Sequence, residues 1–275
     1  MSNVHHQSSK LRLDQELVER GLLPTRSQAE SYIKLGSVTV NGKQITKPGF
    51  SVSSEDKIKL TVQEQYVSRA GLKLASVAQA LKLDFTDKVV LDVGSSTGGF
   101  TDYALRHGAK KVIAVDVGTE QLHSTLRTNP KIELHEQTDI RNVRLQQTVE
   151  SSKQQAASKT AFKPAALTTS YILLTTVPNL VLIDVSFISL RDVLPHIANL
   201  SGSGTLIVAM VKPQFEAGKA YKHKGVIKND KMRRNTLQDF ENWVQRLFII
   251  ISKADSEIAG AKGNRERFYL LVKSK

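Results

Sequence analysis

A glycine-rich turn between two apolar runs is the first place in this sequence where residue types and spacing indicate chemistry. The first run contains Asp92, the turn Gly94–Gly99 reads G-S-S-T-G-G, and the second run ends at Asp116. Glycine lets the backbone approach a ligand closely, and a carboxylate at a strand tip can accept hydrogen bonds from a ribose diol. The spacing is neither the dinucleotide pattern G-x-G-x-x-G nor a P-loop with its lysine. We therefore expect a smaller nucleoside such as S-adenosylmethionine (SAM).

Charged residues also follow the later apolar runs of the chain. Asp184 and Lys212 end the runs VLID and TLIVAMVK, and Asp139 follows a third run, KIELHEQT. Ligands of parallel α/β sheets bind beyond the carboxyl ends of the strands, so these side chains are expected to meet Gly94 and Asp116 at one edge. A lysine held there among other charged groups can act as a general base, and Lys212 is our candidate.

The acceptor of a methyl group can be narrowed by elimination. SAM already carries a reactive methyl group and a leaving group, so the protein must align the acceptor and, where needed, remove its proton. The chain has no Cys, the nucleophile that methylation of pyrimidine C5 usually needs. Enzymes that methylate exocyclic nitrogens typically carry N/D-P-P-F/Y/W, whereas Asp184–Phe187 reads D-V-S-F. This weakens a nitrogen acceptor and favours a hydroxyl acceptor, which requires a base.

The order of the predicted elements indicates how these residues are positioned. Helices are predicted over residues 72–81 and 100–107, a long helical stretch over 231–251, and a closing pair of strands within 256–272. Strands alternating with helices predict an α/β domain of Rossmann-like type, with a parallel sheet, right-handed crossovers and a final antiparallel strand pair. Residues 146–179, rich in Ser, Thr, Gln and Ala, are expected to form a partly disordered surface insertion.

Residues 11–62, the small module, follow a different pattern. Apolar residues at helical spacing end at Gly21, and a second helical stretch begins after Thr25 and ends at Gly36. The segment SVTVNGKQI then alternates apolar and polar residues around Asn41-Gly42, the strongest short hairpin signal. These patterns predict a small α+β fold. The predicted organisation is a disordered tail (1–10), the small module (11–62), a linker (63–70) and the large domain (71–275).

Composition excludes several classes of function. The chain of 275 residues carries a net charge of +13, which favours a polyanionic partner, most simply nucleic acid. The absence of Cys removes disulfides, iron–sulfur clusters and thiol nucleophiles, and His5 and His6 lack metal-ligand spacing, so no metal site is expected. No apolar run approaches the about 20 residues of a membrane span, and the start lacks the apolar core of a signal peptide. We expect a cytoplasmic protein that does not bind membranes, and a monomer.

Short motifs in the small module carry a resemblance to a known family. They are R-L-D, T-R at Thr25–Arg26, A-x-x-x-I and G-x-V-x-V-N-G. With them the module resembles the S4 RNA-binding domain of ribosomal protein S4 and of many RNA-modifying enzymes. The resemblance implies that basic side chains of the two helices and the hairpin contact structured RNA, namely Arg12, Arg26, Lys34, Lys43 and Lys47. Such contacts set position and affinity through phosphates and RNA shape.

Motifs along most of the chain carry a second resemblance. They read YVSRAGLKL, LDVGSSTGGFTD, AVDVGTEQL, DVSFISL, VKPQFE, KGV and GNRERFYL. With them the chain resembles the TlyA family, known both as hemolysin A and as an rRNA methyltransferase. Its members join an S4 domain to a methyltransferase domain similar to the FtsJ/RrmJ ribose 2′-O-methyltransferases. The related enzymes carry a Lys-Asp-Lys-Glu tetrad, which by motif position becomes Lys73, Asp184, Lys212 and Glu266.

The resemblance implies a role for each of these residues. Lys212 would take the proton of a ribose 2′-hydroxyl. Lys73 and Glu266 would orient that lysine and the ribose, and Asp184 would steady the lysines near the SAM methyl group. Arg265 and Arg267 flank Glu266 where the family more often has apolar or aromatic neighbours.

The resemblance also implies a cofactor and a substrate. The loop around the methionine part of SAM would be formed by Gly94, Ser96, Gly98 and Gly99, while Asp116 would hold the ribose and Asp139 would reach the adenine amino group. The family acts on cytidine 2′-hydroxyls of ribosomal RNA, and its members differ in whether they modify one ribosomal subunit or both. The basic run over residues 219–234 is expected to bind phosphates.

Other functions stay open at this point. The methyltransferase fold could have lost activity and serve as an RNA-binding, ribosome-associated factor, although an intact tetrad argues against this. A pore-forming toxin, suggested by the hemolysin name, would need an amphipathic membrane segment, and the sequence shows none. A nicotinamide-dependent enzyme is disfavoured by the glycine spacing.

Overall fold

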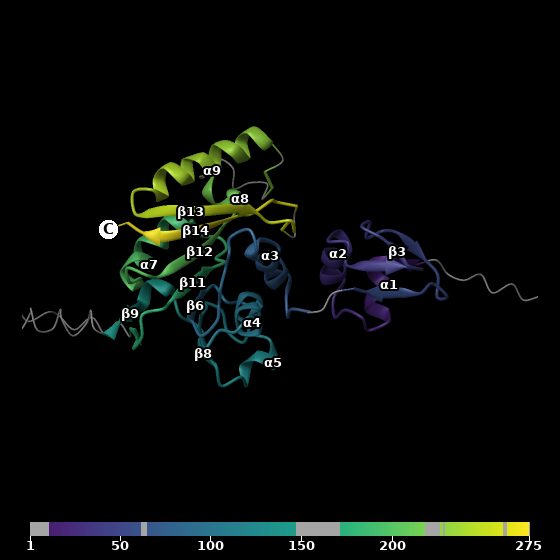
Figure 1. The fold of residues 1–275 in the computed structure, drawn as a ribbon, viewed down its shortest axis with the longest axis horizontal. Coiled ribbons are helices and arrows are strands. Elements are labelled where there is room, and N and C mark those ends of the chain that lie inside the picture. The colour runs from purple at the N-terminus through teal and green to yellow at the C-terminus, as the bar shows by residue number, and fades with distance from the viewer. Residues whose placement is uncertain are drawn as a thin grey trace, which may run out of the picture.

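The structure, a computed structural model, describes residues 11–61, 65–146, 171–217, 226–227, 229–260 and 263–274. Within these ranges the chain forms the small module and a large α/β domain (Figure 1). The predicted tail lies outside the described residues, as do most of the predicted insertion (147–170) and the first part of the basic run (219–225). The expectations for these segments therefore stay predictions.

The small module contains two helices and short antiparallel strands. Its elements are β1 (Leu11–Arg12), α1 (Leu13–Glu19), α2 (Arg26–Lys34), β2 (Val38–Val40), β3 (Lys43–Gln44), β4 (Ser51–Val52) and β5 (Ile58–Leu60). Thr25 caps α2, because its hydroxyl accepts a hydrogen bond of 3.2 Å from the backbone N–H of Gln28. Asn41 and Gly42 both adopt positive φ, as the tight turn between β2 and β3 requires. The predicted helix pair and hairpin are therefore present.

A seven-stranded sheet forms the centre of the large domain, in the order β13-β14-β12-β11-β6-β7-β8. Neighbouring strands from β12 to β8 run parallel, and β14 runs antiparallel to both β12 and β13. The strands are β6 (Val89–Val93), β7 (Lys111–Val115), β8 (Ile132–His135), β11 (Leu180–Ile183), β12 (Leu206–Val211), β13 (Phe248–Asp255) and β14 (Arg267–Lys273). A separate short parallel pair is formed by β9 (Val143–Leu145) and β10 (Ile172–Leu174). The predicted parallel sheet with a final antiparallel pair is confirmed.

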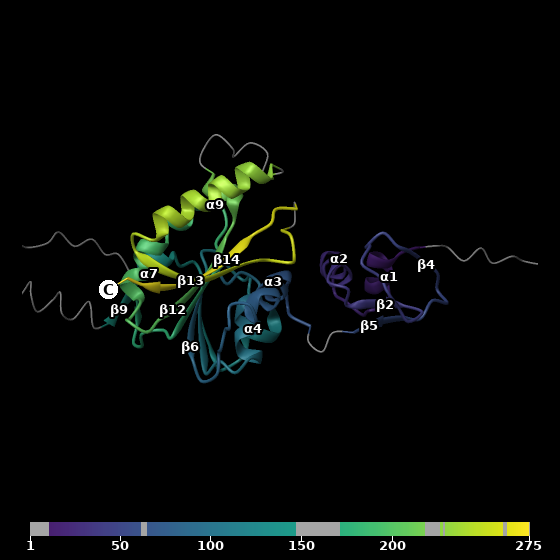
Figure 2. The same cartoon turned by 45° about the horizontal axis from the view of Figure 1, so that its top comes forward.

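Helices cover both faces of this sheet, because alternate strand residues point to opposite sides (Figure 2). One core joins α3 and α4 to Val90, Leu182 and Phe268, and the other joins α7 and α9 to Leu91 and Ile183. The helices are α3 (Arg69–Ala78), α4 (Gly99–Arg106), α5 (Ser124–Arg127), α7 (Leu194–Leu200), α8 (Pro213–Glu216) and α9 (Asp230–Val244), with 3₁₀ turns η1 (Ile140–Asn142) and η2 (Leu190–Asp192).

The helix predicted over residues 231–251 is wrong in its last part. The helix α9 ends at Val244, and the run that begins at Phe248 forms the edge strand β13. Burial alternates along this strand, with Phe248 buried and Ile249 and Ile251 exposed. β-branched isoleucines are favoured in strands, and here pairing with β14 outweighs the helical pattern that precedes them.

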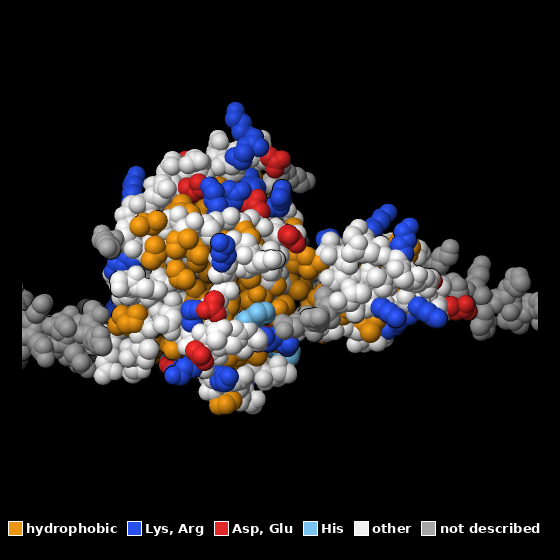
Figure 3. All heavy atoms as spheres, viewed as in Figure 1, with side chains coloured by type: hydrophobic (Ala, Val, Ile, Leu, Met, Phe, Trp, Pro, Cys, Tyr) orange, Lys and Arg blue, Asp and Glu red, His pale blue; other side chains and the backbone are white. Residues whose placement is uncertain are grey.

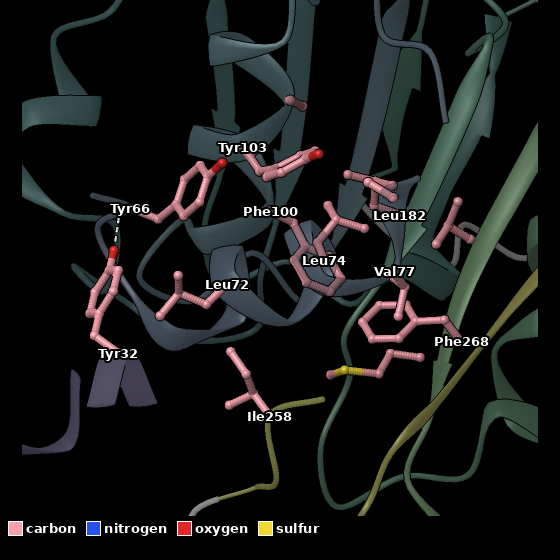
Figure 4. Close-up of a cluster of buried hydrophobic side chains, with 14 of the residues drawn as sticks. Tyr32, Tyr66, Leu72, Leu74, Val77, Phe100, Tyr103, Leu182, Ile258 and Phe268 are labelled. Atoms are coloured by element: carbon pink, nitrogen blue, oxygen red, sulfur yellow. Dashed lines mark hydrogen bonds between the residues drawn. The ribbon is translucent and has the colours of Figure 1, made fainter. Parts of the chain in front are cut away.

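The small module contacts the large domain through the segment that precedes α3 (Figure 4). The Tyr66 N–H donates to the hydroxyl of Tyr32 at 3.4 Å, and the amide of Gln28 donates to the Tyr66 carbonyl at 3.0 Å. On the other side, the Val67 N–H donates to the buried carboxylate of Asp102 at 2.9 Å, and the rings of Tyr66 and Tyr103 lie 5.3 Å apart. Tyr66 is thus buried between the two parts of the chain.

Candidate active site

The carboxyl ends of β6 and β11 bring Gly94 and Asp184 together. The Asp184 N–H donates to the Val93 carbonyl at 3.0 Å, which extends the parallel pairing by one residue. Gly94 has φ +80°, and a Cβ at this position would lie 2.9 Å from the Asp184 carbonyl oxygen. Only glycine fits here without strain, so the predicted glycine turn lets two strand ends approach each other.

Lys212 follows β12, the next strand, and pairs with Asp184. Its Nζ lies 2.6 Å from Asp184 Oδ1, and it donates a hydrogen bond of 2.6 Å to the hydroxyl of Ser186. Both side chains of the ion pair are mostly buried, so the interaction is only weakly screened by solvent. These contacts hold the lysine in one place. A group that reacts with a bound substrate must be positioned in this way.

Glu266 lies beside Lys212 and pairs with Lys73 from α3. Val211 of β12 pairs with Arg267 of β14, so the next residues along, Lys212 and Glu266, neighbour each other on adjacent strands. Lys73 Nζ donates to Glu266 Oε1 at 3.1 Å, and the two residues are only 8% and 2% exposed. The structure therefore gathers Lys73, Asp184, Lys212 and Glu266 at one edge of the sheet, and we call them the strand-end cluster.

One oxygen of Glu266 is without a hydrogen-bond partner among the described residues. This oxygen, Oε2, is buried, while Oε1 accepts from Lys73. Leaving a buried carboxylate oxygen unpaired costs free energy, and such atoms are uncommon in folded proteins. A hydroxyl group brought to this position by a ligand would satisfy it.

The arginines that flank Glu266 have their own partners. Arg267 donates two hydrogen bonds to Asp255, of 2.6 and 3.1 Å, and Arg233 of α9 donates to the same carboxylate at 2.7 Å. Burial by itself raises the pKa of Asp255, but the hydrogen bonds from Arg267 and Arg233 outweigh it and lower the pKa to about 2. Arg233 also donates to the Arg265 carbonyl at 3.1 Å, so the chain is held on both sides of Glu266.

A cavity of about 380 Å³ opens next to the strand-end cluster, within the range of small-ligand sites. Predicted cofactor residues and Asp184 line it together, namely Gly94, Ser96, Asp116, Asp139 and Asp184. Apolar side chains such as Val115 and Ile140 complete its wall. The cavity therefore combines polar groups at strand ends with an apolar surface on which an adenine ring can pack.

Asp116 organises the loops at the mouth of this cavity. Its carboxylate accepts hydrogen bonds from the backbone N–H groups of Ser96, at 2.8 Å, and Gly118, at 2.7 Å. Ser96 adopts positive φ, which points its N–H at this acceptor. Asp139 caps the turn η1 and pairs with Arg141 at 2.6 Å. Each carboxylate keeps lone pairs for a nucleoside, because an ionised carboxylate offers about four acceptor positions.

Gly98 and Gly99 are not among the residues that line this cavity. Gly98 has φ +90° and precedes α4, where a Cβ would clash with Leu122 and Leu126. A Cβ on Gly99 would clash with Ser68 and lie 2.8 Å from the backbone nitrogen of Gly71. In this structure both glycines allow α4 to start in close contact with its neighbours.

Asp92 is a buried titratable group whose role did not follow from the sequence. It is fully buried in β6, and the Thr101 hydroxyl donates to it at 2.6 Å. Burial, together with the nearby carboxylates of Asp184 and Asp116, raises its pKa to about 7 against the hydrogen bond from Thr101. The strained backbone of Phe187, with φ +66° and a side chain 90% exposed, was likewise not expected.

The predicted RNA contacts of the small module lie on its surface, but they are not equivalent. Arg12 and Arg26 both donate to the fully buried Asp14, at 2.9 and 2.8 Å, while their side chains stay about half exposed. Lys43 and Lys47 are exposed and form no ion pair with the residues that the structure describes. Figure 3 shows Lys and Arg side chains spread over the face of the small module that is in view.

Comparison with known proteins identifies both parts of the chain. Residues 66–274 match the family of FtsJ-like methyltransferases, and residues 11–58 match the S4 domain. The chain is 35% identical over 94% of its length to the 23S rRNA (cytidine-2′-O)-methyltransferase TlyA of Campylobacter jejuni, covering 98% of that protein. It is 33% identical over 95% of its length to the 16S/23S rRNA (cytidine-2′-O)-methyltransferase TlyA of Mycobacterium tuberculosis, covering 90% of that protein.

A solved structure shares the architecture of the whole chain. It is described as a hemolysin from Streptococcus thermophilus, is 34% identical, and aligns with a TM-score of 0.63 over 98% of this chain and 90% of its own. Across the described ranges, no helix is long and apolar enough to cross a membrane. The same residues contain no group of three or more His, Cys, Asp or Glu side chains that could hold a metal ion.

Proposed function

The chain belongs to the FtsJ-like methyltransferase family and carries an S4 domain, and we propose that it transfers a methyl group from SAM to the 2′-hydroxyl of a cytidine in ribosomal RNA. The relatives from C. jejuni and M. tuberculosis bear the name of this reaction. The observation that carries the proposal is the arrangement of two buried lysine–carboxylate pairs beside a cavity of nucleoside size.

The residues around the cavity of about 380 Å³ suit SAM. Asp116 would accept from the ribose hydroxyls, Asp139 from the adenine amino group, and Gly94 leaves room for the methionine part. When bound, SAM supplies an electrophilic methyl group next to a positive charge. The carboxylates that line the cavity would stabilise such a positive charge. Asp184 is the one among them that also pairs with Lys212.

The strand-end cluster would prepare the acceptor. Lys212 Nζ, in its uncharged form, would take the proton of the ribose 2′-hydroxyl as that oxygen receives the methyl group, whose bond to the sulfur of SAM breaks. Asp184, 2.6 Å from Nζ, stabilises the ammonium that results. The unpaired Glu266 Oε2 would accept an N–H of Lys212, its neighbour on the adjacent strand, and so turn that amine toward the 2′-hydroxyl, while Lys73 keeps the carboxylate in place.

The S4 domain would bring the RNA to this site. Its exposed lysines and half-exposed arginines can neutralise phosphates, and its contacts through Tyr66 connect it to the large domain. A ribosomal substrate would place the protein in the cytoplasm. The monomeric state expected from the sequence stays a prediction.

The test is methyl transfer from labelled SAM to purified small and large ribosomal subunits that lack the modification, with the product nucleoside identified by mass spectrometry. We expect 2′-O-methylcytidine from at least one subunit, and the subunit that is labelled defines the substrate. A methyl group on a base would contradict the roles given to Lys212 and Glu266. No transfer to either subunit, with SAM binding intact, would favour an RNA-binding factor without activity.

A further inference from the structure

A second cavity, of about 820 Å³, lies next to the proposed SAM site and has no role in the function proposed above. It is bounded by the turn after β11, by α8 and by the first turns of α9. Phe187 and Ile188 line both cavities, so the two hollows share a wall. Ligands bound in the two cavities would therefore lie next to each other.

The charge of this cavity does not favour phosphate. Among the described residues that line it, Asp192, Glu216 and Asp239 contribute carboxylates, against the cations Arg191 and Lys231, and Arg191 lies 3.7 Å from Glu216. This excess of acidic groups contrasts with the net charge of +13 of the whole chain. An anion would be repelled from such a lining, whereas a group that donates hydrogen bonds would be attracted.

The acidic side chains differ in whether they are free to bind. Glu216 accepts from the Ser189 hydroxyl at 2.6 Å and from the Leu190 N–H at 2.8 Å, so it holds the shared wall in place. Asp192 and Asp239 are exposed to the cavity and make no ion pair or hydrogen bond through their side chains with the residues described here. Their oxygens are available to a ligand.

One face of α9 supplies polar groups with both donors and acceptors. Met232, Asn235, Thr236 and Asp239 follow one another at helical spacing and all line the cavity, as does the ring of Phe215. Carboxylate and amide groups next to apolar surface are the combination that recognises the edge of a nucleobase. Asp accepts from an exocyclic amino group, and Asn can both donate and accept.

From these observations we propose that this second cavity binds the base of the nucleotide adjacent to the one that is methylated, a base that carries an exocyclic amino group. The base lies between Phe215 and α9, with its amino group toward Asp192 or Asp239. Its phosphate stays at the rim, near Lys231. This inference rests on the proposed function, because consecutive nucleotides of one strand would occupy two cavities that share a wall.

A single cysteine can test this placement without relying on activity, because the chain contains no Cys. Asn235→Cys puts a thiol in the cavity, and Asn242→Cys puts one on the same helix, outside the cavity lining. The rate of alkylation by iodoacetamide is measured with and without ribosomal subunits that lack the modification. We expect the subunits to slow labelling of Asn235→Cys by about 10-fold or more and to leave Asn242→Cys nearly unchanged, because only a buried thiol is shielded from the reagent. Equal protection of both thiols, or of neither, would overturn the proposal.

Filling the cavity provides a second test. Asn235→Trp should lower kcat/KM for ribosomal subunits by about 10-fold or more, equivalent to about 1.4 kcal/mol, while SAM affinity and melting temperature stay as in the parent protein. Asn242→Trp is the matched control and should keep full activity. Unchanged activity of Asn235→Trp would disprove the base-binding role of the second cavity and leave the proposed function standing. If the unsubstituted protein methylates neither subunit, it is the proposed function that fails.

Discussion

The small module and the strand-end cluster both pair cations with buried carboxylates, yet they leave the cations in opposite environments. In the small module, Asp14 is fully buried, while the guanidinium groups of Arg12 and Arg26 that bind it remain about half exposed. In the strand-end cluster the lysines are buried as well, with Lys73 only 8% exposed. The same kind of pair therefore presents positive charge to solvent in one region and encloses it in the other.

The two regions also differ in how many cations each carboxylate binds. Burial raises the pKa of Asp14, but the hydrogen bonds from Arg12 and Arg26 outweigh it, and the pKa falls below its usual value. With Glu30, which lies near Arg26 and Lys34, the three cations Arg12, Arg26 and Lys34 face two carboxylates, and the positive charge that remains at the surface suits a phosphate backbone. In the strand-end cluster each carboxylate binds one lysine, Glu266 with Lys73 and Asp184 with Lys212, so the pairs add no excess positive charge to the site. Substitutions in the two regions should therefore affect different steps.

The largest effect is expected from Lys212→Ala, which removes the proposed base. Turnover should fall by about 10³-fold or more, since a positioned base contributes about 10²–10⁴-fold and the ion pair with Asp184 is lost as well. The dissociation constant of SAM, measured by calorimetry, should change little. Activity comparable with the parent protein would remove Lys212 from the mechanism.

Asp116→Ala should affect the cofactor rather than the RNA. The substitution removes the acceptor for the Ser96 and Gly118 N–H groups as well as the proposed acceptor for the ribose. The SAM dissociation constant should rise by about 10–100-fold, as expected when charge-assisted hydrogen bonds are lost. Titration of SAM by calorimetry measures this effect, and binding of RNA in gel-shift assays serves as the control. A dissociation constant equal to that of the parent protein would exclude the proposed contact.

Asp255→Asn tests whether the arginine network positions Glu266. The amide cannot bind Arg267 and Arg233 as a carboxylate does, so the chain around Glu266 should loosen. We expect kcat to fall by about 10-fold with the KM for SAM unchanged, because small displacements of orienting groups are costly. Glu257→Gln, an exposed carboxylate near Asp255 that forms no ion pair with the described residues, shows the effect of removing a charge outside this network. A loss of melting temperature without loss of kcat would indicate a structural role only.

Lys43→Ala combined with Lys47→Ala should weaken RNA binding and leave the chemistry intact. Both lysines are exposed, so the fold should not change, whereas replacing Arg12 or Arg26 would leave Asp14 buried with fewer partners. Each lost phosphate contact should lower the salt slope of log K by about 1, and the dissociation constant for ribosomal subunits should rise by about 5–10-fold. At saturating RNA, kcat should equal that of the parent protein. A change in kcat would contradict the separation between the two regions.

Asp92→Asn should change how stability depends on pH. The folded pKa of about 7 lies above the unfolded value of 3.8, so the folded state binds this proton more tightly. The unfolding free energy that Asp92 contributes is therefore fully present below about pH 4 and is lost as the pH rises toward about 7. The asparagine variant cannot ionise, so its melting temperature relative to the parent should rise between about pH 4 and pH 7, at about 2–4 °C per kcal/mol. Parallel melting curves would show that Asp92 does not titrate in this range.

Much of the fold and part of the candidate site could be predicted because the signals are local. Apolar runs that end in charged residues mark the carboxyl ends of strands, and parallel strands bring those ends to one edge. Asp116, Asp184 and Lys212 were expected at that edge for this reason, and the structure has them there. The strand β13 was missed, because its isoleucines continue a helical pattern and only pairing with β14 makes them a strand.

The sequence by itself determined the two-part organisation, the parallel sheet with its glycine turn, and the residue types at the strand ends, because these depend on periodicity over a few neighbouring positions. Only the tertiary structure decided which charges pair. Lys73 and Glu266 are 193 residues apart, and Arg12 and Arg26 share Asp14 only because α1 and α2 pack together. The second cavity and the network around Asp255 are also invisible in the sequence. Ion pairs and cavities form between elements that are distant in the chain, and their geometry is set by packing rather than by local pattern.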